Sequence, residues 1–204
     1  ILRNFMGILD RISVPDGLKQ LSTVELEELA KELRAKIIEV TAQCGGHLSS
    51  SLGAVELCIV LHTIFDSPRD KILWDVGHQA YAHKILTDRR ERFKTLRQYQ
   101  GISGFPKKEE SPHDIFTVGH ASTSISTALG IAKARDLAGE NFSVVAVIGD
   151  ASIAGGMALE GINNSMILKS NLIVILNDNE MSISRAVGSL ANYLTSVRTS
   201  KWYV

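Results

Sequence analysis

The chain has 204 residues, of which 45% are hydrophobic, which is enough to bury the core of one domain. Its 22 basic and 22 acidic residues cancel, so no excess of positive charge points to nucleic acid as a partner. No apolar run approaches the roughly 20 residues that a membrane helix needs. The two cysteines, Cys44 and Cys58, cannot form a thiolate zinc site alone and are expected to be free thiols in a reducing compartment.

Hydrophobic spacing and turn residues divide the chain into helices and short strands. A capping-box pattern at Ser22 and Glu25 opens the first long helix, and Gly45-Gly46 ends it. The predicted elements that follow are, in order, a helix over about 53–65, a strand over 71–74, a helix over 122–137, a strand over 143–148, a helix over 154–168 and a strand over 172–176. Residues 1–20 are expected to be irregular, and the polar residues 88–113 are expected to form a surface excursion.

The alternation of strands and helices predicts an α/β fold with a doubly wound, mostly parallel sheet flanked by helices. The runs that precede Asp150 and Asn177 are short and β-branched, which is typical of buried parallel strands. Residues 185–204 show no obvious closing element, so we expect the domain to be incomplete at its carboxyl-terminal end.

The most informative pattern is Asp150 after one predicted strand and Asn179 after the next. A right-handed crossover through the intervening helix would make these strands parallel neighbours about 5 Å apart. One carboxylate and one amide oxygen would then meet at the carboxyl edge of the sheet, where open α/β sheets bind ligands. Two hard oxygens suit Mg²⁺, which completes its shell with phosphate oxygens and water. The alternative interpretations are a helix N-cap for Asp150 and a turn residue for Asn179.

This spacing resembles the thiamine diphosphate motif, in which Gly-Asp-Gly is followed by a later Asn. Three further segments, 45–53, 74–87 and 118–126, narrow the resemblance to the 1-deoxy-D-xylulose-5-phosphate synthase family, and residues 177–184 agree with it. The resemblance implies the thiamine diphosphate-binding fold. Residues 1–204 would form the diphosphate- and Mg²⁺-binding domain of such an enzyme, with the pyrimidine-binding and carboxyl-terminal domains outside this chain.

The resemblance also implies roles for individual residues. His47 and His78 would be catalytic, lining the cavity near the reactive thiazolium carbon, where an imidazole can move protons or bind substrate oxygens. The implied cofactor contacts are His78, Gly119, His120, Ala121, Ala151, Ser152 and Asn179, and the implied metal ligands are Asp150, Asn179 and the backbone carbonyl of Met181. The remaining histidines are interpreted as structural or solvated; they are His62, His83 and His113.

Two positions depart from the family pattern. Ala151 replaces the third motif glycine, and alanine does not easily adopt a positive φ. We therefore expect either an ordinary backbone conformation or a slightly different loop there, with the N–H groups of Ala151 and Ser152 offered to the diphosphate at a helix start. Ala121 stands where the family often has serine, so only its backbone can contact the cofactor.

The implied enzyme is a thiamine diphosphate- and Mg²⁺-dependent transferase that joins pyruvate, with loss of CO2, to D-glyceraldehyde 3-phosphate. Its product, 1-deoxy-D-xylulose 5-phosphate, begins the non-mevalonate isoprenoid pathway and feeds thiamine biosynthesis. The expected partners are the remaining domains of the same enzyme and a second copy in a homodimer, with neither nucleic acid nor membrane. Alone, the chain is expected to bind Mg²⁺ and the diphosphate without turnover. The lack of a visible secretory signal favours the bacterial cytoplasm, with a plastid as the alternative.

Three other functions stay open at this stage. The amino-terminal half of a transketolase would share the fold, the metal pair and the glycine-histidine turns. A nicotinamide-binding domain would need a G-x-G-x-x-G run after its first strand, which the chain lacks. A non-catalytic assembly domain would keep the site residues without using them.

Overall fold

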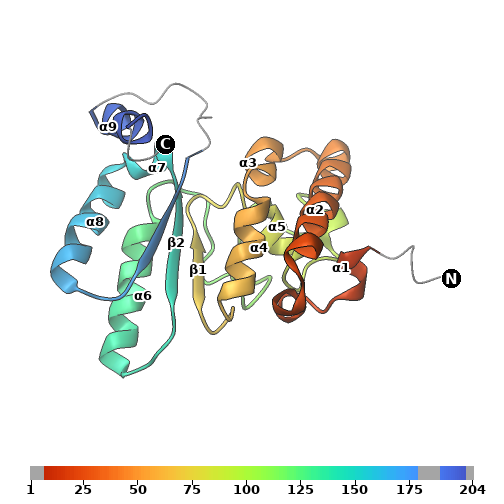
Figure 1. Cartoon of the computed structure of the whole chain (residues 1–204), viewed down its shortest axis with the longest axis horizontal. Coiled ribbons are helices and arrows are strands. Elements are labelled where there is room, and N and C mark those ends of the chain that lie inside the picture. Colours follow the sequence, from red (N-terminus) through yellow and green to blue (C-terminus); the bar gives the residue numbers. More distant parts are fainter. Residues whose placement is uncertain (1–6, 179–188, 201–204) are drawn as a thin grey trace.

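A computed structural model of the chain describes residues 7–178 and 189–200 (Figure 1). In these ranges β1 (Lys71–Trp74), β2 (Val144–Gly149) and β3 (Ile173–Asn177) form one parallel sheet in the order β1-β2-β3. The register pairs Lys71 with Val144 and Gly149 with Asn177. All three strands therefore end at the same edge of the sheet, which confirms the expected parallel arrangement.

The helices agree with most of the expected spans. In chain order they are α1 (Ile8–Arg11), α2 (Thr23–Cys44), α3 (Leu48–Leu52), α4 (Val55–Ile64), α5 (Tyr81–Ile85), α6 (Ser124–Ala138), α7 (Asp150–Ile153), α8 (Gly156–Leu168) and α9 (Ser189–Arg198), with 3-10 helices at Asp16–Gln20 and Phe93–Thr95. The capping box is confirmed, because the Ser22 hydroxyl accepts from the Glu25 N–H while the Glu25 carboxylate accepts from the Ser22 N–H. No helix in the described ranges is long and apolar enough to cross a membrane.

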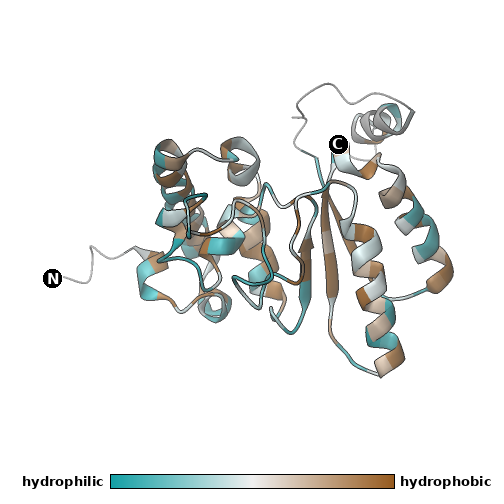
Figure 2. Cartoon of the chain, turned by 180° about the vertical axis from the view of Figure 1, so that it is seen from behind, coloured by the Kyte–Doolittle hydropathy of each residue, from teal (hydrophilic) through white to brown (hydrophobic). Residues whose placement is uncertain are grey.

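Helices cover both faces of the sheet (Figure 1). Along β2, Val145 and Val147 pack into a core shared with α2 and α4, whereas Val144, Ala146 and Ile148 pack with α6 and α8. This alternation follows from the period of two along a strand. The central strand, β2, is hydrophobic over nearly its whole length because neither of its faces meets water (Figure 2). The doubly wound α/β fold expected from the sequence is therefore confirmed.

The segment 88–113 is only in part the surface excursion that its polar composition predicted: residues 97–100 and 107–109 are exposed, whereas other side chains of the segment are buried. Arg89 is only 1% exposed, and Phe93 and Leu96 are fully buried. The polar side chains are accommodated because they pair with one another in the interior. Arg89 donates to the Asp114 carboxylate and also to the Thr87 hydroxyl, the latter at 2.7 Å. The polarity of each residue taken alone does not show which polar side chains will pair in the folded protein.

Two further expectations were wrong. Residues 7–20 are not irregular, since they contain α1 and a 3-10 helix with a buried Leu18. The segment 185–204 contains α9, whose described side chains are exposed, and the incompleteness of the domain at this end stays a prediction. β3 is not buried, because it is an edge strand that pairs only with β2 among the described residues, and Val174 stays 40% exposed.

Candidate functional site

The carboxyl ends of β2 and β3 lie side by side, as the spacing of Asp150 and Asn179 predicted. Gly149, the last residue of β2, pairs with Asn177, the last residue of β3. Asp150 thus stands at the edge from which residues 178 onward leave the sheet. Asn179 and Met181 lie outside the described residues, so their part in a metal site stays a prediction.

Asp150 begins α7 instead of capping it, since Gly149 holds the N-cap position. No hydrogen bond or ion pair joins the half-buried Asp150 carboxylate to another described residue. In the described ranges no three residues among His, Cys, Asp and Glu gather in a way that could hold a metal ion. Such a lone carboxylate suits Mg²⁺, which takes few protein ligands, better than a metal that needs a closed protein cage.

Ala151 follows within the single turn of α7, and its φ is not in the positive range. Of the two alternatives for this departure from the family pattern, the ordinary backbone conformation is therefore the correct one. Alanine fits there without strain, and Ala151 and Ser152 remain in the first turn of a helix at the sheet edge.

A hydrogen bond joins the Asp150 turn to the His120 turn. The Ser122 hydroxyl donates to the Ser152 carbonyl at 2.7 Å. Gly155 comes so close to the His120 turn that a Cβ on it would lie 2.0 Å from Ser122 Oγ, which explains the glycine. Gly155 also lies between α7 and α8, where the sequence predicted one continuous helix. At Gly156, by contrast, an added Cβ would meet nothing within 4 Å.

Asp75 ties the end of β1 to the same turn. Its carboxylate is 1% exposed and accepts from the backbone N–H groups of Ser122, at 2.8 Å, and Ser124, at 3.0 Å. It therefore satisfies the amino-terminal N–H groups of α6 and places a negative charge at the positive end of that helix. These two partners lie 47 and 49 residues away from Asp75 in the sequence.

The two histidines predicted to be catalytic lie close together. The ring centroids of His47 and His78 are 6.1 Å apart, with an interplanar angle of 78°. His47 precedes α3 and His78 follows β1, and the two turns are joined because the hydroxyls of Ser50 and Ser51 both donate to the His78 carbonyl. The structure brings the pair together, and their catalytic role stays a prediction.

Burial sets the protonation state of both rings. Desolvation lowers the pKa of His47, and the nearby His78 and Arg97 lower it further. Desolvation also lowers the pKa of His78, against the opposing charge of Asp75. Both imidazoles are thus neutral near pH 7. The Nδ1 atom of His78 is buried without a hydrogen-bond partner among the described residues.

Sequence reasoning missed two residues that contact His47. The Tyr81 hydroxyl accepts from the His47 backbone N–H at 3.1 Å and lies 3.4 Å from its Nδ1. The ring of Phe105 lies 5.0 Å from the His47 ring. Tyr81 could have been noticed within the matched segment 74–87, whereas Phe105 lies in the segment that was interpreted as a surface excursion.

Gly119, His120 and Ala121 are exposed at the edge of the sheet. Gly119 and His120 line a cavity of about 270 Å³ with Trp74 at the end of β1. Because Ser122 bonds to Ser152, this turn lies next to α7, as contact with a common ligand would require. Among the described residues, those predicted for the cofactor thus gather at one edge of the sheet.

The other histidines are buried, which confirms their structural interpretation. His62 Nε2 and His83 Nδ1 are 2.9 Å apart, and His83 Nε2 donates to Asp114 at 2.9 Å. His113 Nδ1 lies 2.9 Å from the Ser67 hydroxyl. These contacts lie on the α4 and α5 side of the fold and do not extend to Asp150.

Comparisons with known proteins agree with this geometry. A sequence model of the family described as 1-deoxy-D-xylulose-5-phosphate synthase matches residues 9–204. The chain is 60% identical over 196 residues to the 1-deoxy-D-xylulose-5-phosphate synthase of Carboxydothermus hydrogenoformans, covering 96% of this chain and 32% of the relative. It is 59% identical over 195 residues to that of Thermus thermophilus, again covering 96% and 32%.

A third relative, 1-deoxy-D-xylulose-5-phosphate synthase 1 of Geobacter metallireducens, is 62% identical over 196 residues, or 96% of this chain and 31% of the relative. The chain thus spans about a third of the length of the curated relatives it matches. The matches favour the synthase and not the transketolase alternative. The chain belongs to the 1-deoxy-D-xylulose-5-phosphate synthase family.

Proposed function

We propose that this chain is the diphosphate- and Mg²⁺-binding part of a thiamine diphosphate-dependent transferase. The whole enzyme would condense pyruvate, with loss of CO2, and D-glyceraldehyde 3-phosphate to 1-deoxy-D-xylulose 5-phosphate. Family membership supports the reaction, since the relatives are named for this synthase. The observation that carries the site is the pairing of Gly149 with Asn177, which brings Asp150 to the edge where residues 178 onward begin.

The described residues fit both groups. The Asp150 carboxylate has no partner among the described residues and would hold Mg²⁺ together with Asn179 and the Met181 carbonyl, which lie outside them. The N–H groups of Ala151 and Ser152 would face the diphosphate, with Gly119, His120 and Ala121 on the neighbouring turn. Bound thiamine diphosphate would supply a nucleophilic carbon at its thiazolium ring.

The chain's own residues would bind and orient around that centre. Neutral His47 and His78 can each donate one N–H to a substrate oxygen and accept a proton at the other nitrogen. Their lowered pKa values keep them neutral at pH 7, so they do not attract anions by charge. From the buried side, Tyr81 fixes the His47 turn and Asp75 fixes the His120 turn, which holds both turns in place before a ligand arrives.

The proposal extends to the biological setting that the resemblance implies. The product would enter isoprenoid and thiamine biosynthesis, and the remaining domains of the same enzyme, in a homodimer, would complete the site. No residue of this chain is assigned to activate the aminopyrimidine ring. We therefore expect the isolated 204 residues to release no CO2 from pyruvate. Sedimentation of the full-length enzyme tests the dimer.

The decisive test uses the full-length enzyme that contains this segment. It is supplied with Mg²⁺, thiamine diphosphate, pyruvate and D-glyceraldehyde 3-phosphate, and the CO2 and phosphorylated product are followed by mass. Asp150→Asn should abolish the product and weaken Mg²⁺-dependent cofactor binding. The matched control is Glu160→Gln, which neutralises an exposed carboxylate on α8 of the same crossover and should behave as wild type.

Two results would overturn the proposal. Transfer from a ketose phosphate without use of pyruvate would make the enzyme a transketolase. Binding of Mg²⁺ and thiamine diphosphate that is equal in wild type and Asp150→Asn would indicate an assembly domain that merely retains the site residues.

A further inference from the structure

The turn formed by residues 103–106 touches both histidine turns of the candidate site. The ring of Phe105 lies 5.0 Å from the ring of His47 at an angle of 46°. Pro106 packs against Gly77, which precedes the second histidine, and a Cβ on Gly77 would lie 2.3 Å from Pro106 Cδ. Movement of the 103–106 turn would therefore alter the surroundings of both imidazoles.

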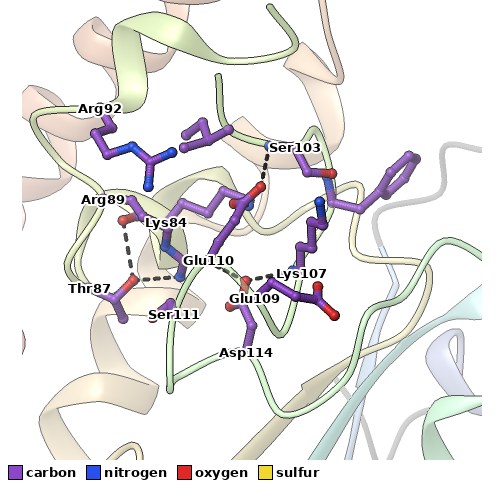
Figure 3. Close-up of polar contacts among 12 residues, drawn as sticks. Lys84, Thr87, Arg89, Arg92, Ser103, Lys107, Glu109, Glu110, Ser111 and Asp114 are labelled. Atoms are coloured by element: carbon purple, nitrogen blue, oxygen red, sulfur yellow. Dashed lines mark hydrogen bonds and ion pairs between the residues drawn. The ribbon is translucent and has the colours of Figure 1, made fainter. Parts of the chain in front are cut away.

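One carboxylate fixes this turn to the interior. Glu110 Oε1 accepts from the Ser103 backbone N–H at 2.6 Å, and Glu110 Oε2 accepts from Lys84 Nζ at 2.7 Å. Figure 3 shows the Glu110 side chain placed between Lys84 and Ser103. Lys84 belongs to α5 and its side chain is fully buried, while that of Glu110 is 9% exposed. The turn is thus tied to a charge that cannot reach water.

This ion pair is not explained by stability alone. The desolvation of two charges cancels most of their attraction, so an apolar pair of similar volume would serve the core equally well. Burial lowers the pKa of Lys84, and the hydrogen bond to Glu110 opposes that shift. The carboxylate adds geometric specificity that an apolar pair would lack, because its two oxygens hold Lys84 Nζ and the Ser103 N–H at hydrogen-bonding distance from one side chain.

We propose that Glu110 is a positioning residue that holds the 103–106 turn against His47 and thereby sets the exposure and orientation of that imidazole. Only the effect on turnover rests on the proposed function; the effect on the imidazole does not. The turn acts on His47 in two ways. It contributes to the burial that lowers the pKa of His47, and a hydrogen bond with the Gly104 backbone raises that pKa.

The test measures His47 directly in the full-length enzyme without cofactor. Carbethoxylation by diethyl pyrocarbonate, which requires a neutral imidazole, is followed at the His47 peptide by mass spectrometry across pH. In Glu110→Gln the new amide presents its NH₂ group either to the Lys84 ammonium or to the Ser103 N–H, so the turn loosens. We expect His47 to react several-fold faster at high pH. The pH midpoint of the His47 reaction should rise toward 6.5, because burial is the main cause of the lowered pKa of His47 and the variant reduces that burial.

The matched control is Glu109→Gln. This neighbouring carboxylate is exposed and contacts the Thr117 hydroxyl at 3.3 Å, away from the turn, so His47 should react as in wild type. Glu110→Gln removes the counter-charge of the buried Lys84, so this variant can fail to fold. Phe105→Leu therefore serves as a second variant. It removes the ring beside His47, leaves the ion pair intact and should accelerate the reaction of His47 in the same direction.

Wild-type reactivity of His47 in folded Glu110→Gln would overturn the proposal, and so would wild-type reactivity in Phe105→Leu. In the active enzyme, Glu110→Gln should lower kcat by up to about a hundredfold, with a smaller change in KM, since small displacements of a catalytic group cost rate on that scale. A response of His47 in an enzyme that forms no deoxyxylulose phosphate would support the positioning role and refute the proposed function. The two failures are thus distinguishable.

Discussion

Asp114→Asn tests the buried polar network around α5, which Figure 3 shows in part. The Asp114 carboxylate is 3% exposed and accepts from His83 Nε2 at 2.9 Å, from the Lys107 backbone N–H at 2.7 Å and from the Arg89 guanidinium. An asparagine keeps one acceptor oxygen and turns an NH₂ group toward the other donors. Arg89 would then stay buried without its main counter-charge.

The magnitude follows from burial. Removing one partner of a buried ion pair costs about 3–5 kcal/mol, because the other charge remains away from water. Asp88 also approaches Arg89 Nε, at 3.6 Å, but its side chain is 50% exposed and compensates little. The pair of Lys31 with Glu28 is exposed, so solvent screens it and its loss should cost little. Glu28→Gln is therefore the matched control for the loss of one carboxylate charge.

The assay is amide hydrogen exchange of the full-length enzyme, resolved by mass spectrometry over the peptides that span 83–93 and 103–118. A loss of about 3–5 kcal/mol corresponds to exchange that is faster by about two to three and a half orders of magnitude. Glu28→Gln should leave these peptides as in wild type. If the exchange rates of these peptides in Asp114→Asn stay within about tenfold of those in Glu28→Gln, the argument that an uncompensated Arg89 dominates the loss of stability is refuted.

Two further predictions concern pH and the site. Burial lowers the pKa of His83 from 6.5 to about 4 against the opposing Asp114, so the unfolded chain binds more protons in that window and stability should fall as the pH falls through it. Hydrogen exchange of the α5 peptides, corrected for its intrinsic pH dependence, should show this loss of stability. In His83→Gln the stability should change less steeply with pH, and equal slopes in the two proteins would contradict the assignment of the pH dependence to His83. Gly155→Ala should weaken thiamine diphosphate binding, because its Cβ would lie 2.0 Å from Ser122 Oγ, whereas Gly156→Ala meets open space and should bind as wild type. Equal dissociation constants by calorimetry would show that the contact between Ser122 and Ser152 does not shape the site.

Local signals predicted the elements that carry the site. The capping box of α2, the β-branched run of β2 and the small-residue helix α6 were recognisable because each is specified by neighbours within a few residues. The closeness of Asp150 to the start of the 178–181 segment also followed from the sequence, since a crossover between parallel strands leaves little freedom in where the strands end.

Contacts between distant segments were not predictable in this way. Asp75 caps α6 from β1, and Glu110 ties Ser103 to Lys84, although nothing in the adjacent sequence indicates either partner. Part of the segment 88–113 was misjudged for the same reason, because a buried Arg89 has the composition of a surface residue until Asp114 is placed beside it.

The sequence by itself determined the fold class, the two histidine turns and the edge at which Asp150 stands, because periodicity and turn chemistry are local properties. Only the tertiary structure decided that His47 and His78 face each other at 6.1 Å, that Phe105 and Tyr81 hold His47, and that a glycine is required at 155 but not at 156. These are distances between groups far apart in the chain. They depend on how complete elements pack, and close packing leaves no local trace in the order of the residues.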